Sequence, residues 1–220
     1  MNKKCPRCNL NNQIDSKSCV RCSQDLREVS SESGNSAGRP VGYSIIRRAA
    51  ICLLVSLLTV AGFFVSLLLS SKPLSGKQKA QVDRAIEILD DAGFSEEVYY
   101  LRNYAFFRSD DHWLNALVPK EDAYAATNYP FEIMTIYQEF FTYTEDDVER
   151  AAIMLHESRH LLGKDEQDAY EYVWKNKSRL GWTRKKYSDS VVWMNVRKQT
   201  KELAPGLFIC EFNQFGDCFE

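Results

Sequence analysis

The sequence contains few of the residues that dominate extended or low-complexity chains. Among its 220 residues there are only ten glycines and six prolines, and no internal repeat is apparent. These low counts exclude a collagen-like chain and a wholly disordered one, because both classes have a strongly biased composition. Histidine is also scarce, with three in the chain. A motif that uses two of them is therefore informative.

Charge is missing altogether from residues 49–69. At about 1.5 Å per residue, these 21 residues form about 31 Å of helix, which matches the core of a bilayer. The stretch starts 48 residues into the chain and lacks a small-residue exit, so a retained anchor is favoured over a cleaved signal peptide. A buried helix of a soluble protein would need apolar neighbours on every side. We therefore expect a transmembrane helix over residues 49–69.

The charges on the two sides of this stretch predict its orientation. Residues 1–48 carry nine Lys and Arg against four Asp and Glu, whereas residues 70–220 carry nineteen against twenty-six. Arg47 and Arg48 directly precede the apolar stretch, and basic residues are retained on the cytoplasmic side of membranes. The sequence thus predicts a single-pass membrane protein with a cytoplasmic N-terminus and an extracytoplasmic domain over residues 70–220. Residues 28–48, rich in Ser and Gly with several Arg, read as a flexible basic linker.

The first 27 residues contain two C-x2-C pairs separated by ten residues, formed by Cys5, Cys8, Cys19 and Cys22. Such pairs present four sulfurs to one tetrahedral zinc and close the site to water. The segment resembles the short bacterial zinc ribbons found at the N-termini of membrane proteins. It differs from them at Asn9 and Ser23, where such knuckles commonly have Gly. We expect a structural zinc that folds this small module.

The basic residues of the ribbon could contact an anionic partner. They are Lys3, Lys4, Arg7, Lys17, Arg21 and Arg27. Dispersed basic residues beside a membrane more often serve topology and solvation, so nucleic acid is not favoured and the cytoplasmic partner stays unknown. Cys210 and Cys218, near the other end of the chain, would form a disulfide in an exported domain or stay free thiols in a cytosolic one.

Hydrophobic spacing predicts an α+β fold for the outer domain, with a small sheet packed on several helices. A helix is expected over residues 77–92, ending at Gly93, and a strand over residues 131–141 after Pro130. Thr144 is expected to cap a helix over residues 145–162, which Gly163 ends. Further helices are expected over residues 165–177 and from a cap at Ser188 to about residue 203. The aromatic segment 94–113 is compatible with either helix or strand.

The helix over residues 145–162 carries the motif His156-Glu157-Ser158-Arg159-His160. Two histidines four residues apart on a helix share one face, so both can bind one zinc. The intervening glutamate is then placed to act as general base and acid. This pattern resembles the zincin metallopeptidases. The resemblance implies a zincin-like fold, a catalytic zinc held by His156 and His160, and Glu157 as the catalytic residue.

A third zinc ligand is expected shortly after the helix ends. The frame H-E-S-R-H-L-L-G-K-D-E resembles the metzincin motif, with Gly163 at the turn and Glu166 where that family has its third histidine. Glu166 also begins an E-x-x-A segment that resembles the source of the carboxylate in gluzincins. Both comparisons favour Glu166. Asp165, Asp168 and Glu171 remain alternatives, and any of them is otherwise an ordinary exposed acid.

Several other residues have weaker claims to a role in the site. Met194 could form a Met-turn, although a single apolar Met usually fills a core. Tyr170, Tyr172 and His112 could polarise a substrate. Arg159 could pair with a nearby carboxylate such as Asp165 or Glu166, which would complicate the assignment of the third ligand.

Together these features predict a membrane-anchored zinc peptidase that acts on a peptide or protein substrate. One alternative keeps the metal but cleaves an amide in cell-wall material. The other is a non-enzymatic membrane adaptor or sensor, in which the ribbon and the outer domain bind partners and the histidine helix is structural.

Overall fold

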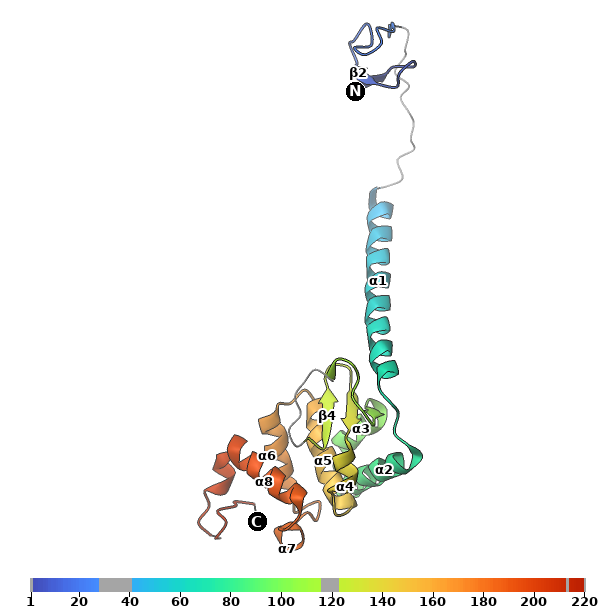
Figure 1. Ribbon diagram of the computed structural model, residues 1–220. Helices are drawn as coiled ribbons and strands as arrows, with labels where there is room; N and C mark the ends of the chain where they lie inside the picture. Colours follow the sequence, from blue (N-terminus) through green and yellow to red (C-terminus); the bar gives the residue numbers. More distant parts are fainter. Residues whose placement is uncertain (1, 28–40, 116–122, 213, 220) are drawn as a thin grey trace. The chain divides into compact units, whose positions relative to one another are not determined.

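The computed structural model describes residues 2–27, 41–115, 123–212 and 214–219. The chain divides into two compact units, Met1–Leu57 and Leu58–Glu220 (Figure 1). The first contains the cysteine module, and the second contains the C-terminal domain together with the last turns of the long helix that precedes it.

The cysteine module has a two-stranded antiparallel sheet, β1 (Asn2–Lys4) and β2 (Asn11–Gln13). Its small core consists of Cys5, Cys19 and Leu26, with part of Leu10 packed against them. So few buried apolar side chains stabilise a fold poorly without a cross-link or metal.

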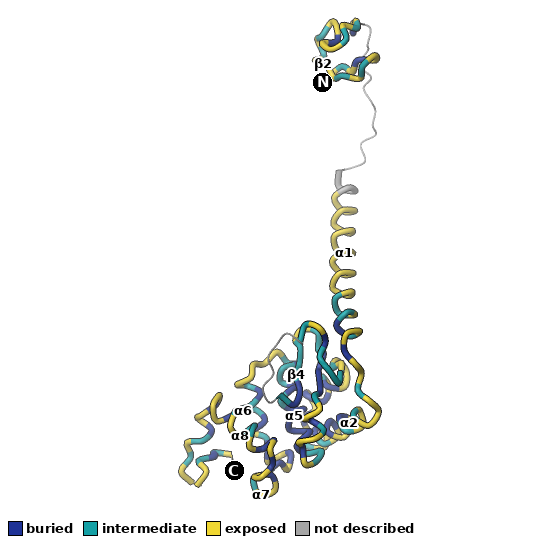
Figure 2. Tube along the Cα trace, in the orientation of Figure 1, coloured by how far each residue is buried: buried dark blue, intermediate teal, exposed yellow. Residues whose placement is uncertain are grey.

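Helix α1 (Val41–Ser70) contains an apolar segment, Ile45–Ser70, that is long enough to cross a membrane. Most of its described side chains are exposed, as the yellow colour along α1 shows (Figure 2). The prediction of an apolar helix of membrane length is confirmed, and the helix starts before the expected residue 49. The orientation of the chain across a membrane stays a prediction.

The C-terminal domain mixes helices with one small sheet, so the α+β expectation is confirmed at that level. Its elements are α2 (Gly76–Asp91), α3 (Ser95–Asn103), β3 (Phe106–Arg108), β4 (Ala125–Asn128), β5 (Ile133–Ile136), α4 (Gln138–Thr142), α5 (Asp147–Leu161), α6 (Glu166–Asn176), α7 (Arg184–Tyr187), α8 (Val191–Leu203) and the 3-10 helix η2 (Pro205–Phe208).

The sheet has the order β3-β5-β4, with β3 parallel and β4 antiparallel to β5. In this register Phe107 and Thr127 both lie opposite Met134. Helix α5 packs against β4 and against α2, α3 and α6, so it is the central element of the domain. All five residues of Ala151–Leu155 on α5 are buried, which explains why the helix carries apolar residues on more than one face.

The strand expected over residues 131–141 is wrong in length. Strand β5 covers only four of these residues, and the short helix α4 begins at Gln138. Glu132 has a positive φ of 51°, so it belongs to the turn that precedes the strand. Phe140 is buried and Phe141 is partly buried, and their spacing from Tyr137 is that of a helix.

Two predicted helix caps are also wrong, because a nearby residue serves instead. The Thr144 hydroxyl donates to the carbonyl of Phe140 in α4, and Asp146 caps α5 by accepting from the N–H groups of Val148 and Glu149. The cap of α8 is Ser190 rather than Ser188.

The end of the domain packs around a cluster of three buried tryptophans. Trp174, Trp182 and Trp193 contact one another with ring centroids 4.9 to 6.2 Å apart, and Phe208 packs on Trp174. Cys210 and Cys218 form a disulfide in the segment that follows, as the exported-domain alternative predicted.

Candidate metal centres

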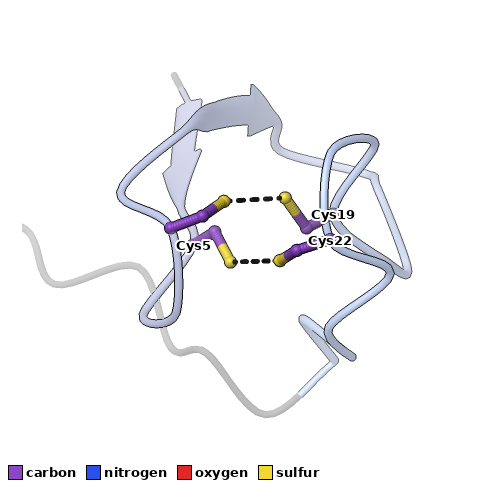
Figure 3. Close-up of side chains that lie close together, drawn as sticks. Cys5, Cys19 and Cys22 are labelled. Atoms are coloured by element: carbon purple, nitrogen blue, oxygen red, sulfur yellow. Dashed lines mark hydrogen bonds between the residues drawn. The ribbon is translucent and has the colours of Figure 1, made fainter.

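The four N-terminal cysteines converge on a common point (Figure 3). The Sγ atoms of Cys5 and Cys22 are 3.5 Å apart, and so are those of Cys8 and Cys19. A tetrahedral zinc with sulfurs at about 2.3 Å separates them by about 3.8 Å. The cluster therefore has the composition and spacing of a structural metal site.

The backbone around these cysteines forms two equivalent turns. The N–H of Asn9 donates to the carbonyl of Cys5, and the N–H of Ser23 donates to that of Cys19, each at 2.9 Å. Asn9 and Ser23 both have a φ of 58°. These are the positions where related knuckles use Gly, and Asn tolerates this left-handed conformation better than most residues do. The two departures from the zinc-ribbon pattern thus leave the turns intact.

The charges of the thiols differ within the cluster. The backbone N–H of Arg21 lowers the pKa of Cys19 to about 6, against the effect of burial. The backbone N–H of Gln24 also lowers the pKa of Cys22, but burial and the three neighbouring thiols outweigh it and raise this pKa to about 12. Four thiolates this close repel one another, so a cation between them would stabilise the charged form of all four.

In the C-terminal domain, α5 brings His156 and His160 together. Their Nε2 atoms are 3.2 Å apart. The two side chains retain 14% and 16% exposure, so solvent reaches both rings. The helix thus gives the paired imidazoles the convergence that their spacing predicts.

Glu166, the first residue of α6, places its carboxylate against both rings. One oxygen is 3.2 Å from His156 Nε2, and the other is 3.4 Å from His160 Nε2. Three ligand atoms at about 2.0 to 2.1 Å from a tetrahedral zinc would be about 3.3 to 3.4 Å apart. The donor set fits zinc, and one ligand atom from each of the three residues lies within 4.8 Å of the other two. Gly163, with a φ of 71°, makes the turn that returns the chain to the histidines.

Hydrogen bonds orient the side chains of His160 and Glu166 within the trio. Nδ1 of His160 lies 2.9 Å from the carbonyl of Lys164, which suits donation from this nitrogen and directs Nε2 toward Glu166. Burial opposes protonation of His160, but Glu166 and Glu157 raise its pKa to about 9. Hydrogen bonds from the two histidines lower the pKa of Glu166.

The three alternative ligands are engaged elsewhere. Asp165 caps α6 by accepting from the N–H of Asp168. The Asp168 carboxylate pairs with Arg159 at 2.9 Å, and Glu171 pairs with Lys175 one turn further along α6. Of the four acids considered from the sequence, Glu166 alone groups with the two histidines.

Arg159 pairs with a nearby carboxylate, as expected, but the partner is Asp168 rather than Asp165 or Glu166. Besides Asp168, it contacts Glu97 on α3 at 3.5 Å and covers the ring of Tyr172 at 4.1 Å. It therefore links α3, α5 and α6, and it holds the helix that supplies Glu166.

A cavity of about 290 Å³ opens beside His156. Its polar lining includes His156, Glu157, Glu166 and Tyr170. Its apolar side includes Ala125 of β4, Ile153 of α5, Val173 of α6 and the α8 residues Val196 and Leu203. An apolar pocket with a few converging polar groups is the usual form of a small ligand site.

Glu157 is held by a residue that the sequence gave no reason to select. The hydroxyl of Thr127 on β4 donates to Oε2 of Glu157 at 2.7 Å, and Glu157 is only 5% exposed. These two residues are thirty positions apart in the sequence, and they meet because β4 packs against α5. Only the strand order and register bring them together.

Of the weaker residues, Tyr170 alone lies at the site. Its ring centroid is 4.4 Å from that of His156, and burial together with Glu166 and Glu157 raises its pKa, so the phenol stays protonated. Tyr172 stacks under Arg159, and His112 is buried, with Nδ1 accepting from the N–H of Asn115. Met194 is half exposed and lines a different cavity, so neither a Met-turn nor a core position describes it.

Comparison of the chain with the sequence profiles of protein families, with curated proteins and with solved structures finds no match. The four-cysteine cluster and the trio His156, His160 and Glu166 are therefore interpreted from their geometry alone.

Proposed function

We propose that the C-terminal domain is a zinc-dependent peptidase, anchored to a membrane by α1. The single observation that carries the proposal is the equal spacing of His156 Nε2, His160 Nε2 and the Glu166 carboxylate, at 3.2 to 3.4 Å, beside a solvent-accessible cavity. Two imidazoles and one carboxylate are the ligand set of catalytic zinc sites that keep a fourth position open.

In this proposal Glu157 is the general base and acid. Zinc held by the trio would supply a Lewis acid that polarises a carbonyl and lowers the pKa of water. Glu157 takes the proton from the attacking water and later returns it to the leaving amine. Thr127 fixes one carboxylate oxygen by hydrogen bonding, which leaves the other oxygen to handle the proton.

The substrate side of the site is formed by β4 and Tyr170. Strand β4 lies at one edge of the sheet, and no strand within the described residues pairs with its outer side. A peptide can bind such an edge as an additional strand, which orients its carbonyl groups along the cavity. The protonated Tyr170 hydroxyl can donate a hydrogen bond to an oxygen that gains negative charge during the reaction.

The test is the variant Glu157→Gln in the full chain, with Glu171→Gln as the control. Both changes remove one carboxylate, and Glu171 is tied up with Lys175 outside the cavity. We expect Glu157→Gln to keep two zinc ions per chain and to lose hydrolysis by several orders of magnitude. Glu171→Gln should retain both. Casein and peptidoglycan fragments serve as substrates, which separates a peptidase from a cell-wall amidase. Hydrolysis that persists in Glu157→Gln contradicts the mechanism.

A further inference from the structure

Beyond the proposed site, the last turns of α1 are packed against the C-terminal domain by aromatic rings. Phe63 contacts Trp113 and Phe131 with centroids 5.5 and 5.3 Å away. Phe64 contacts Phe106 at 5.3 Å and Phe131 at 6.3 Å. All of these rings belong to the compact unit Leu58–Glu220. The turn between β4 and β5, which carries Phe131, therefore lies alongside the helix rather than beyond its end.

Hydrogen bonds fix Trp113 to the same face of α1. Its indole Nε1 donates to the Ser66 hydroxyl, and its backbone N–H donates to the Ser70 hydroxyl, both at 3.2 Å. Leu67, on this face, is fully buried, while Val65 and Leu69 on the other side are 48% and 82% exposed. One side of the helix end is thus covered by protein, and the other remains apolar and uncovered.

The position of these contacts along the helix decides what surrounds them. Phe63 precedes Ser70 by seven residues, or about 10 Å of helix. If the bilayer core ended on the N-terminal side of Phe63, only residues 49–62 of the charge-free segment would lie within it. These residues form about 21 Å of helix, whereas the hydrocarbon core is roughly 30 Å thick. Filling the difference from the other end would draw Arg47 and Arg48 into the membrane, which is costly.

We propose that the turn 129–132 and Trp113 are immersed in the interfacial zone of the bilayer beside α1. The side chains concerned are incompletely buried by protein: Tyr129 is 64% exposed, while Trp113 and Phe106 are each 45% exposed. Trp and Tyr favour this zone because an apolar ring and a polar group can each find a suitable environment there. We call Tyr129, Trp113 and Phe106 the aromatic patch; it packs on the same turns of α1 that expose Val65 and Leu69, so a bilayer around these turns would contact both.

The charged groups beside the patch are compatible with this position. Lys72 follows α1, is 82% exposed and pairs with Asp110 at 3.2 Å, so it can extend to the headgroups. Glu132 ends the turn, and burial raises the pKa of its carboxyl, which lowers the cost of placing it near lipid. The inference depends on α1 spanning the membrane and not on hydrolysis by the domain.

The experiment uses the full chain in vesicles of phosphatidylcholine brominated on the acyl chains near the headgroup, with unbrominated vesicles for comparison. Bromine quenches tryptophan emission at short range. Of the four tryptophans, Trp113 alone is exposed, because the other three are at most 1% exposed in the core of the domain. We expect brominated lipid to reduce the emission of the native chain and to leave that of Trp113→Phe unchanged.

Two further variants test the turn itself. In the Trp113→Phe background, tryptophan is introduced at Tyr129 or at Tyr143, which are 64% and 54% exposed. Tyr143 follows α4, at the other end of β5 from the turn. The inference requires quenching of W113F/Y129W and none of W113F/Y143W. Absence of quenching at both Trp113 and position 129 overturns it. The vesicles are then washed with alkaline carbonate. If the chain stays bound, only the position of the turn and Trp113 is wrong. If the chain is released, the membrane span is wrong as well.

Discussion

Replacing Glu166 by Gln tests the outer metal site without knowledge of any substrate. The change keeps the shape and helix propensity of the side chain and removes the negative charge that lies 3.2 and 3.4 Å from the two imidazoles. If the trio binds zinc, the variant loses an anionic ligand. If the trio is only a hydrogen-bonded group, the native chain holds no zinc there at all.

The expected loss can be worked out from the number of ligands. Zinc binds to four protein ligands with about 10–16 kcal/mol, or about 2.5–4 kcal/mol per ligand. Removing one ligand therefore weakens binding by about two to three orders of magnitude. The ribbon site is unaffected, because it belongs to the other compact unit.

The assay measures zinc per full-length chain at a fixed concentration of a competing chelator. The native chain should hold two zinc ions, Glu166→Gln should hold one, and the control Glu171→Gln should hold two. A native chain with a single zinc, or a Glu166→Gln variant that resists the chelator as well as the native chain does, would refute the assignment.

Three further predictions follow from contacts around the site. Thr127→Val removes the hydroxyl that donates to Glu157. Because hydrogen bonds to charged groups contribute about 1.5–3 kcal/mol, the rate of hydrolysis should fall about 10- to 150-fold while zinc is retained. Equal rates in the variant and the native chain would show that the hydroxyl does not orient the base. Arg159→Lys loses the planar group that links three helices, and zinc affinity, measured by chelator competition, should fall about 10- to 100-fold, whereas an unchanged affinity would mean that α6 is held by other contacts. Burial opposes ionisation of Asp146, but hydrogen bonds led by that from Lys186 lower its pKa, so its contribution to stability is present above about pH 4 and is lost as the pH falls through the lowered pKa. Asp146→Asn should therefore lower Tm by a few degrees at most near pH 7, and this difference should shrink as the pH falls below about 4; a difference that stays constant in acid would contradict this origin.

The helices that carry the outer site could be predicted from the sequence because their signals are local. Helix α5 was expected over residues 145–162 and covers Asp147–Leu161, and α6 was expected over residues 165–177 and covers Glu166–Asn176. Gly163 between them has the left-handed φ that its position predicted. These features depend on residues at most four positions apart, which is why periodicity and capping rules detect them.

The sheet could not be predicted in the same way. Strand β3 pairs in parallel with β5 although 24 residues separate Arg108 from Ile133, and no local pattern encodes that pairing. The contact of Thr127 with Glu157 and that of Arg159 with Glu97 follow from the tertiary arrangement alone. Sequence reasoning therefore identified the groups that converge on the histidines and missed the groups that orient them.

Strand β4 sets the distance between the cavity and the turn that packs on α1. It ends at Asn128, immediately before the turn that packs on α1, and begins at Ala125, which lines the cavity. Four residues of strand extend about 13 Å. If the turn lies at the lipid surface as proposed, so short a strand would keep the cavity close to the bilayer. A polypeptide anchored in the neighbouring lipid would then be within reach, whereas a freely diffusing one would have to approach the membrane first.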